Sequence, residues 1–402
     1  MTSESVGSPC PEENGARPEP VAPPIVADAS APATPVVTDV SAEPPLLPPP
    51  EAVAPSSAPA PVAPERPLHP FVFHGDAREY FRVWIVNTLL TLLTLGVYSA
   101  WAKVRKRRYL RGNCELMGHR FDYLADPRRI LVGNILVVLM FLAYMVVGEV
   151  YPFVRFGALG VGLLLLPWVV VRSLAFNAHN TAYRGMRFCC RRTNGSAALL
   201  FLGQWLVIAV TAGLYYPAWV RNRKEFVVNG HRLGDAFFRF ESKSGPFYLT
   251  YLVSGCTVFG IAFAGAMLTG LLVAGNQGKL PSMLQLAPFF ALYGLGVFFA
   301  KHFVYANLFN HIWSHTRLDH HRFSATLSTG KWLQLQFVNL GAIIISAGLL
   351  YPWAVVRSTR YALSCLHFSP DGPIEKISRL GRSTGSAVGE TAAEFVGLDF
   401  GL

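Results

Sequence analysis

Charged residues are scarce in this chain. Asp, Glu, Lys and Arg make up 15% of its 402 residues, whereas 52% are hydrophobic and the mean hydropathy is +0.34. Average soluble domains carry about 25% charged residues, so this composition excludes an ordinary soluble enzyme. Six cysteines, with no closely spaced pair except Cys189 and Cys190, are too few for a disulfide scaffold, and the absence of a Gly-X-Y period excludes collagen.

Motifs for catalysis, cofactor binding and nucleic-acid binding are also missing. The sequence has no Ser-His-Asp signature, no Walker A loop and no Gly-rich dinucleotide motif after a plausible strand. Its basic runs are not accompanied by a helix-turn-helix, RNP or zinc-finger pattern. We therefore expect no enzymatic activity, no cofactor and no nucleic-acid partner.

Proline and acidic residues concentrate at the N-terminus. Residues 1–70 hold 19 of the 29 prolines, and residues 1–66 contain nine acids but only two bases. Such a segment buries too little apolar surface to offset the entropy of ordering it. We expect a disordered acidic Pro/Ala-rich tail over 1–66, a repeated polytopic membrane domain over 67–368 and a flexible polar C-terminal tail over 369–402. The N-terminal tail is interpreted as a tether, with an SH3-type ligand as the alternative.

Seven long apolar stretches follow the tail. They cover residues 84–102, 130–150, 153–171, 197–220, 247–274, 284–309 and 333–356. Each is close to or above the roughly 20 residues that a helix needs to cross the hydrocarbon core. Tryptophans lie at or near their ends, as is typical of the membrane interface. The sequence therefore predicts an all-α polytopic membrane protein.

A basic motif recurs after several of these stretches. Its aligned arginines are Arg105, Arg172, Arg221 and Arg357, and aligned asparagines follow at Asn113, Asn180 and Asn229. A fainter copy runs from Phe298 to Asn310. Short segments that resemble strands, each with a Phe and then a turn signal, follow most copies. These features predict internal repeats with short cytoplasmic strands between the helices.

The distribution of basic residues constrains the membrane topology. The connection 103–129 has nine bases, whereas 149–153 has none and 275–283 has one. The positive-inside rule is met best if only the last two connections lie outside. This arrangement requires four crossings and three re-entrant or broken helices, interrupted at Gly96, Gly213 and Gly348. Seven plain crossings are the alternative.

The first unit resembles a known family. The residues that carry the resemblance are Phe73-His-Gly75, the segment from Asn87 to Arg105 and the pair Arg108-Tyr109. They are similar to the opening signature of the YjgN-type family of bacterial inner-membrane proteins, domain of unknown function 898. The resemblance covers about residues 70–370 and implies an integral, multi-pass protein of the bacterial inner membrane. It implies no reaction and no catalytic residues. We expect the N-terminal tail and the basic connections to be cytoplasmic.

Polar residues recur next to the predicted breaks. An amide lies nine residues before each aligned glycine and a hydroxyl two residues before it: Asn87, Gln204 and Asn339, and Thr94, Thr211 and Ser346. Polar groups beside broken helices form substrate sites in transporters, so these six residues are a candidate pathway for a small solute. The alternative is that they form hydrogen bonds between packed helices.

The basic clusters have a second interpretation. Lys103, Arg105, Arg108, Arg172, Arg221 and Arg357 are candidate contacts for anionic lipid headgroups, although such residues also serve topology alone. The function is thus that of a transporter or channel or, alternatively, of a non-enzymatic scaffold or lipid-interacting protein. The bilayer is the expected partner, and protein partners are not indicated. The histidines between His302 and His321 lack a zincin glutamate, so we expect no metal site.

Overall fold

The computed structural model describes residues 67–275 and 283–372. The two predicted tails fall on residues 1–66 and 369–402, and of these only 369–372 belong to the described part of the chain.

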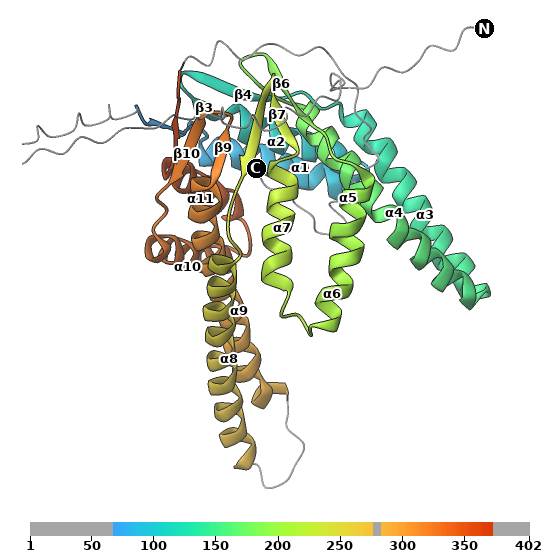
Figure 1. Ribbon diagram of the computed structural model, residues 1–402. Helices are drawn as coiled ribbons and strands as arrows, with labels where there is room; N and C mark the ends of the chain where they lie inside the picture. The colour runs from blue at the N-terminus through green and yellow to red at the C-terminus, as the bar shows by residue number, and fades with distance from the viewer. Residues whose placement is uncertain (1–66, 276–282, 373–402) are drawn as a thin grey trace, which may run out of the picture. The chain divides into compact units, whose positions relative to one another are not determined.

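Helices make up most of the described chain (Figure 1). They are α1 (Ala77–Leu93), α2 (Ser99–Gly112), α3 (Pro127–Val150), α4 (Pro152–His179), α5 (Asn194–Ala198), α6 (Gln204–Val210), α7 (Tyr216–Val228), α8 (Gly245–Ala274), α9 (Met283–Ser314), α10 (Thr329–Ile345) and α11 (Tyr351–Ser364), with a π-helix, η1 (Leu199–Gly203), before α6. Four of them are long and apolar enough to cross a membrane: α3, α4, α8 and α9. They form two hairpins, as the four-crossing arrangement predicts.

The three other apolar stretches are interrupted helices. The breaks separate α1 from α2, α6 from α7 and α10 from α11, and each contains one of the aligned glycines. Gly96, Gly213 and Gly348 have φ values of 92°, 87° and 91°, in the region that favours glycine. In each break the residue before the glycine also has a positive φ. This left-handed pair reverses the chain, so neither helix is long enough to cross a bilayer.

The expectation of an all-α fold is confirmed only in part, because helices predominate but the short strands join into a sheet. The described residues form one eleven-stranded antiparallel sheet, ordered β1-β11-β10-β9-β8-β7-β6-β5-β4-β3-β2. The strands are β1 (His69–Pro70), β2 (Val72–Phe73), β3 (Cys114–Leu116), β4 (His119–Tyr123), β5 (Thr181–Tyr183), β6 (Met186–Cys190), β7 (His231–Leu233), β8 (Ala236–Phe240), β9 (Thr316–Leu318), β10 (His321–Ala325) and β11 (Leu366–Ser369). Short strands appear where the sequence predicts them. They differ from the prediction because they pair with one another in one sheet, as a lone hairpin is only marginally stable.

One extended segment closes the sheet on itself. β1 pairs with β11, and β2, one residue further on, pairs with β3. Both ends of the strand order are therefore parts of the same segment. This closure leaves few unpaired strand edges, which are otherwise a site of aggregation.

The same order of elements recurs around the sheet. α2, α4, α7 and α9 each lead into a β-hairpin, and α11 leads into β11. Each of these helices packs on the strands that follow it, so the five helices are arranged in the order of the strands. The C-terminal part of α9 is thus the fourth helix. In this fourth unit, His315 takes the place that Asn113 and Asn180 have in the first two units. The side chains of Asn113 and Asn180 each contact the backbone carbonyl four residues earlier, and the ring Nδ1 of His315 contacts the carbonyl of His311 in the same way. The predicted counterpart, Asn310, lies inside α9 instead.

Aromatic side chains fill the inside of the closed sheet. Four strands have a phenylalanine at their middle position: Phe121 in β4, Phe188 in β6, Phe238 in β8 and Phe323 in β10. Phe368 is the counterpart in β11. Ring centroids of Phe188 and Phe238 are 6.2 Å apart, those of Phe238 and Phe323 6.3 Å, and those of Phe323 and Phe368 5.1 Å. We call these five residues the aromatic belt. Together with buried residues from the other strands they form one hydrophobic core.

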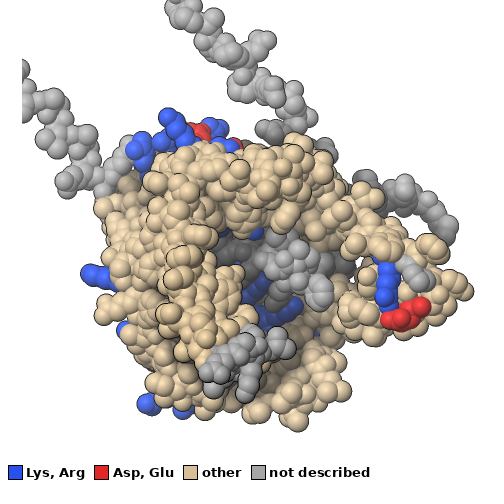
Figure 2. Space-filling model, turned by 90° about the horizontal axis from the view of Figure 1, so that it is seen from below, with Lys and Arg blue, Asp and Glu red and all other residues tan. Residues whose placement is uncertain are grey.

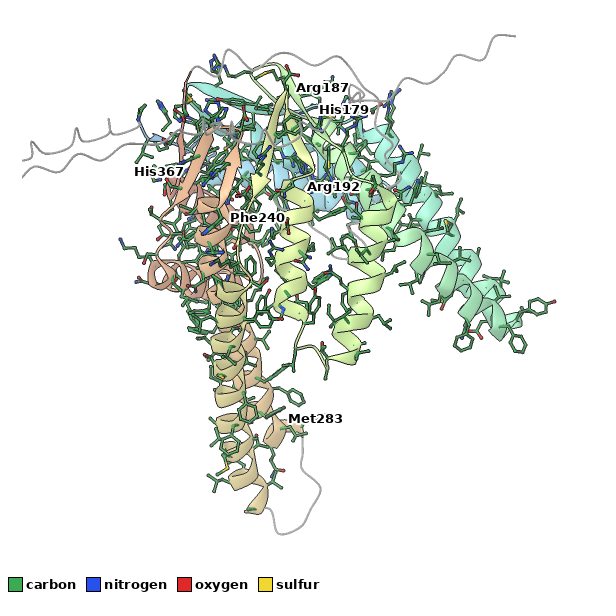
Figure 3. All side chains as sticks on the ribbon, viewed as in Figure 1. His179, Arg187, Arg192, Phe240, Met283 and His367 are labelled. Atoms are coloured by element: carbon green, nitrogen blue, oxygen red, sulfur yellow. The ribbon has the colours of Figure 1, made fainter. Side chains whose placement is uncertain are left out.

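The two membrane hairpins extend away from the sheet. Their side chains are mostly exposed to the surroundings, with 6–17% of each apolar window buried. Met283, at the start of α9, lies at the end of its hairpin far from the sheet (Figure 3). α8 and α9 pack closely at Gly265, where an added Cβ would lie 3.3 Å from the Cα of Phe289. The exposed apolar surface fits the bilayer as solvent.

Candidate functional site

A tryptophan and an arginine four residues later occur on four of the five helices. The pairs are Trp101 and Arg105 on α2, Trp168 and Arg172 on α4, Trp219 and Arg223 on α7, and Trp353 and Arg357 on α11. The helical repeat of 3.6 residues places both members of a pair on one face. The guanidinium lies over the indole at 5.8, 5.0 and 5.0 Å in the last three pairs. Arg105 instead donates to the hydroxyl of Tyr98, whose ring stacks on Trp101.

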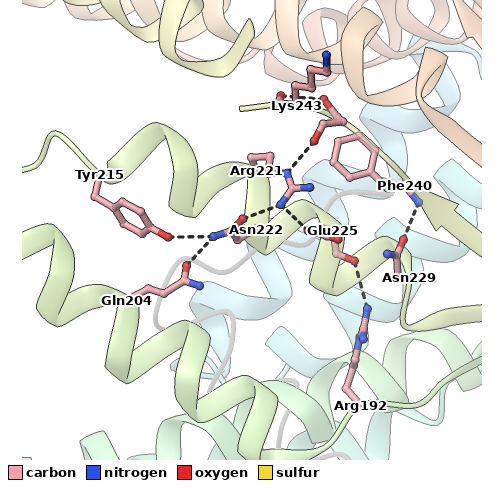
Figure 4. A network of polar contacts seen from close by, with 10 residues as sticks. Arg192, Gln204, Tyr215, Arg221, Asn222, Glu225, Asn229, Phe240 and Lys243 are labelled. Carbon is pink, nitrogen blue, oxygen red and sulfur yellow. Dashed lines mark hydrogen bonds and ion pairs between the residues drawn. The ribbon is translucent and has the colours of Figure 1, made fainter. Parts of the chain in front are cut away.

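The structure pairs a different arginine on α7 from the one that the sequence alignment selects. Arg221 forms an ion pair with Glu225 at 2.7 Å and donates to the carbonyl of Ser242 at 3.0 Å (Figure 4). The ion pair lies within α7, and the bond to Ser242 holds α7 to the segment after β8. Arg223, two residues later, is the one that lies over Trp219. The third copy of the motif is one residue shorter, so the sequence alignment assigns Arg221 to the motif and does not show the pairing of Arg223 with Trp219.

The pair on α11 lines a pocket. This pocket has a volume of about 280 Å³ and is lined by Asp76, Ala77, Trp353, Val356, Arg357 and Arg360. Arg360 is held in place because it donates to the carbonyl of Gly75 at 2.7 Å. Arg357 lies over Trp353 and forms no ion pair within the described residues. Its guanidinium is therefore available to an anion that enters the pocket.

Asp76 closes the pocket on the side of α1. Its carboxylate accepts hydrogen bonds from the backbone N–H groups of Arg78 and Glu79 at 2.9 and 3.1 Å. The bond from Glu79 is the main reason why the pKa of Asp76 lies below its usual value, so the carboxylate is charged at neutral pH. Asp76 is thus an N-cap for α1, and the two arginines give the pocket its net positive charge.

The face from which the membrane hairpins extend is hollowed. Lys and Arg side chains are visible inside the hollow, and the surface around it consists mostly of uncharged residues (Figure 2). The aromatic belt and the rest of the sheet core lie at the sheet end of the five helices that lead into the strands. The hollow is therefore a recess that ends at the sheet.

The remaining candidate headgroup contacts differ in exposure. Arg108 and Arg172 are exposed, and Arg108 also donates to the carbonyl of Tyr123 at 3.3 Å. Lys103 is half-buried. Arg105 is exposed beside Tyr98. The structure thus leaves Arg105, Arg108 and Arg172 exposed and Arg357 half-buried at its pocket, whereas Arg221 is engaged by Glu225.

The three hydroxyls of the candidate pathway are bonded within the breaks. Thr94 donates to the carbonyl of Leu90 at 2.7 Å and accepts from the N–H of Tyr98 at 2.9 Å. Thr211 makes the equivalent pair of bonds at 2.8 and 3.2 Å. Ser346 accepts from the N–H of Leu350 at 3.0 Å. Each hydroxyl therefore bonds within its own break, to the backbone N–H of the residue that precedes the second helix.

Two of the three amides contact the partner helix across the break, and the third, Asn87, is buried on α1. Gln204 accepts from the amide of Asn222 at 3.1 Å, and Asn339 donates to the hydroxyl of Ser358 at 2.9 Å (Figure 4 shows the first contact). Asn87 and Asn339 are only 7% and 2% exposed. The Oδ1 atoms of both lack a hydrogen-bond partner. The amides thus lie between helices, and two of them keep an unused acceptor.

The histidines between His302 and His321 do not form one cluster. Some of them make contacts at the end of α9, and one makes a contact in β10. His311 forms a 2.5 Å hydrogen bond with the hydroxyl of Ser242, and its ring lies 4.1 Å from that of His315. His321 lies in β10 and accepts from the N–H of Asp371 at 2.9 Å. No group of three or more His, Cys, Asp or Glu residues suited to a metal ion occurs within 67–275 and 283–372.

Sequence reasoning missed Arg223, Arg360 and Asp76. Arg360 and Asp76 are far apart in the chain and meet only because α1 packs on α11. The Trp-x-x-x-Arg spacing is a signal that identifies Arg223 in hindsight. At the sheet, Arg187 of β6 contacts the ring Nε2 of His179, the last residue of α4, at 2.8 Å (Figure 3).

Several curated proteins are similar to parts of this chain. The inner membrane protein YjgN of Escherichia coli (strain K12) is 37% identical over 30% of this chain and 31% of its own length. YjgN of Escherichia coli O157:H7 is 25% identical over 71% of this chain and 60% of its own length. YjgN of Salmonella typhimurium (strain LT2) is 31% identical over 30% of this chain and 31% of its own. The matches thus span between about a third and 60% of these relatives.

No solved structure matches the chain significantly. A family model described as "Bacterial protein of unknown function (DUF898)" matches residues 68–395. This match covers all five helix-and-strand units. The chain is therefore a membrane protein that belongs to the DUF898 family of bacterial proteins, whose relatives are named inner membrane proteins.

Proposed function

We propose that this protein is a non-enzymatic protein of the bacterial inner membrane that binds anionic lipid headgroups through its Trp–Arg pairs. The observation that carries the proposal is the pocket at Trp353, Arg357 and Arg360, in which a guanidinium without a carboxylate partner lies over an indole. Tryptophan prefers the headgroup level of a bilayer, and a basic residue there attracts anionic lipids. The pocket combines both preferences.

The position of the pairs supports the same function. Each pair lies near the start or the middle of a helix that runs towards the sheet, and the membrane hairpins extend the other way. This arrangement puts the pairs between the hydrocarbon core and the sheet. The connections that carry most of the bases belong to the sheet, so the positive-inside rule favours a cytoplasmic sheet and N-terminal tail.

The closed core of the sheet argues against an open channel along the ring axis. The aromatic belt occupies the inside of the sheet, and a solute path through it would have to displace packed rings. The hydroxyls next to the breaks already form hydrogen bonds with backbone groups and are therefore unavailable to a solute.

The test is lipid binding by the full-length protein in a neutral detergent. We expect the double variant Arg357→Gln, Arg360→Gln to bind phosphatidylglycerol about fivefold more weakly for each arginine removed, since one basic residue near an anionic surface contributes about 1 kcal/mol. Native mass spectrometry gives the bound fraction, with phosphatidylcholine as the neutral lipid. Arg82→Gln, an exposed arginine on α1 outside the pocket, is the matched control. Equal binding by the double variant and the control would refute the proposal.

A transporter of a small solute is the second candidate. It is favoured by the buried, unpartnered Oδ1 atoms of Asn87 and Asn339, because a polar solute or water is a natural partner for such atoms. A path along these residues predicts that cysteines at positions 87, 204 and 339 react with a water-soluble maleimide in membranes. Dry packing between helices predicts no reaction there, while a cysteine at the exposed Thr193 reacts in both cases.

A further inference from the structure

Three arginines face one another on three neighbouring strands. Arg239 of β8 lies directly opposite Arg317 of β9, and Arg317 lies directly opposite Arg322 of β10. All three side chains are exposed. Facing residues on antiparallel strands have Cβ atoms about 5 Å apart, so this arginine row places three positive charges within about 10 Å.

The same sheet pairs opposite charges elsewhere. Glu115 of β3 lies directly opposite Arg120 of β4, and Glu115 also contacts His74 at 2.8 Å. Like charges at directly facing positions are destabilising in a sheet, whereas opposite charges are favourable. The arginine row is therefore a departure from the charge pattern of the sheet, and folding alone gives no reason for it.

No carboxylate of the described chain neutralises the row. Arg239, Arg317 and Arg322 form no ion pair within 67–275 and 283–372, and neither does Glu241, which shares a small pocket with the first two. That pocket, of about 80 Å³, is also lined by Ser314 and His315. It provides hydroxyl and imidazole groups next to the guanidinium groups, a set that suits a phosphate oxygen.

The row lies where a membrane hairpin meets the sheet. β8 ends at Phe240, five residues before α8 begins, and β9 begins two residues after α9 ends. With a rise of about 3.3 Å per residue, Arg317 lies about 10 Å beyond the end of α9. The arginine row thus lies where the chain passes between the sheet and the α8–α9 hairpin.

We propose that Arg239, Arg317 and Arg322 form a second binding site for an anionic phospholipid headgroup, at the base of the α8–α9 hairpin. The ligand is a lipid whose acyl chains lie along the hairpin and whose phosphate contacts the arginine row. Charge complementarity and the position beside the bilayer favour a lipid over a soluble polyanion. The site extends the proposed function to another surface and does not depend on the pocket at Arg357.

The test compares the triple variant Arg239→Gln, Arg317→Gln, Arg322→Gln with Arg120→Gln, the control on the charge-paired strands. In a neutral detergent, we expect the triple variant to unfold at the same or a higher temperature, since mutual repulsion is removed. The increase in unfolding temperature that phosphatidylglycerol gives the wild type should shrink, and lipid affinity at this site should fall more than tenfold. Arg120→Gln should keep both.

Three results would overturn the proposal. A triple variant that is less stable without lipid, and that responds to phosphatidylglycerol as the wild type does, would give the row a structural role. Equal protection by phosphatidylcholine would remove the charge requirement. Protection by inorganic phosphate or poly-glutamate at concentrations where phosphatidylglycerol has no effect would identify a soluble anion or an acidic protein as the ligand.

A charge reversal separates this site from the pocket. Arg322→Glu should form an ion pair with Arg317 and weaken lipid binding, without affecting the pocket at Arg357 and Arg360. The variants of the two sites are measured side by side, so that failure of one proposal leaves the other intact.

Discussion

Arg223 lies with its guanidinium 5.0 Å from the centre of the Trp219 ring, while Arg221, on the same helix, is paired with Glu225. The two arginines therefore have different roles: the first belongs to the Trp–Arg pairs and the second fixes α7 to the segment after β8.

Replacement of Arg221 tests this division. Arg221→Gln removes the ion pair with Glu225 and the bond to the Ser242 carbonyl, both in a half-buried setting. We expect the free energy of unfolding to fall by about 1–3 kcal/mol, because a hydrogen bond to a charged group is lost and its partner is left unpaired. Thermal unfolding in detergent measures this change. Unaltered stability together with weaker lipid binding would assign Arg221 to the headgroup site instead.

The hydroxyls at the breaks should matter for stability and not for ligand binding. Removal of the hydroxyl by Thr94→Ala, Thr211→Ala or Ser346→Ala is expected to cost about 1 kcal/mol each, the typical net contribution of one hydrogen bond. Thr88→Ala is the matched control, since Thr88 only donates to a carbonyl of its own helix. If any of these three variants lost solute or lipid binding at unchanged stability, the structural role of the hydroxyls would be contradicted.

The aromatic belt should be a major source of stability. Phe238 stacks between Phe188 and Phe323, so Phe238→Ala is expected to lower the free energy of unfolding by about 3–5 kcal/mol. Its neighbour Phe237 is exposed on the other face of β8, and Phe237→Ala should cost much less. Equal effects of the two variants would show that the belt does not pack as described.

Stability should decrease in mild acid through His231. Burial in β7 lowers the pKa of this imidazole below its usual value of 6.5, and its Nδ1 lies 2.7 Å from the carbonyl of Val227. The folded protein thus keeps the ring neutral, whereas the unfolded chain binds a proton below about pH 6.5. The stabilisation is complete above that pH and is lost as the pH falls towards the folded pKa, by at most about 1.4 kcal/mol per pH unit.

The measurement is the unfolding midpoint between pH 7.5 and 5. His231→Gln should flatten this dependence, while His119→Gln, on an exposed residue of β4, should leave it unchanged. Burial also lowers the pKa of His321, which adds a dependence of the same sign. An identical slope in wild type and His231→Gln would disprove the assignment to His231.

Hydropathy and glycine patterns predicted much of the helical architecture. The apolar stretches, the breaks at Gly96, Gly213 and Gly348 and the two hairpins follow from local sequence, because hydrophobic length and positive φ are local properties. The closed sheet could not be predicted in this way. Its register, for example Phe188 opposite Leu233, joins segments more than 40 residues apart, and strands of two to five residues carry little periodicity.

The candidate sites divide in the same way. Arg357 and the polar residues next to the breaks stand out by repetition, which is visible in one sequence. Their chemical state is not visible in the sequence, because whether the Thr94 hydroxyl is free or bonded to the backbone, and whether Arg221 is available or paired with Glu225, depends on side-chain conformation in the folded chain. The pocket between Asp76 and Arg360 and the row of Arg239, Arg317 and Arg322 arise only from tertiary packing and strand register.

The central claim is that the protein crosses the membrane four times and keeps every sheet hairpin on one side. Cysteine labelling with an impermeant maleimide in oriented membranes tests it most directly, with single cysteines at the exposed positions His119, Thr193, Glu241 and Tyr151. We predict that the first three react from the cytoplasmic side and that position 151, between α3 and α4, reacts from the other side. Labelling of positions 193 and 241 from opposite sides would contradict the account, since seven plain crossings require that result.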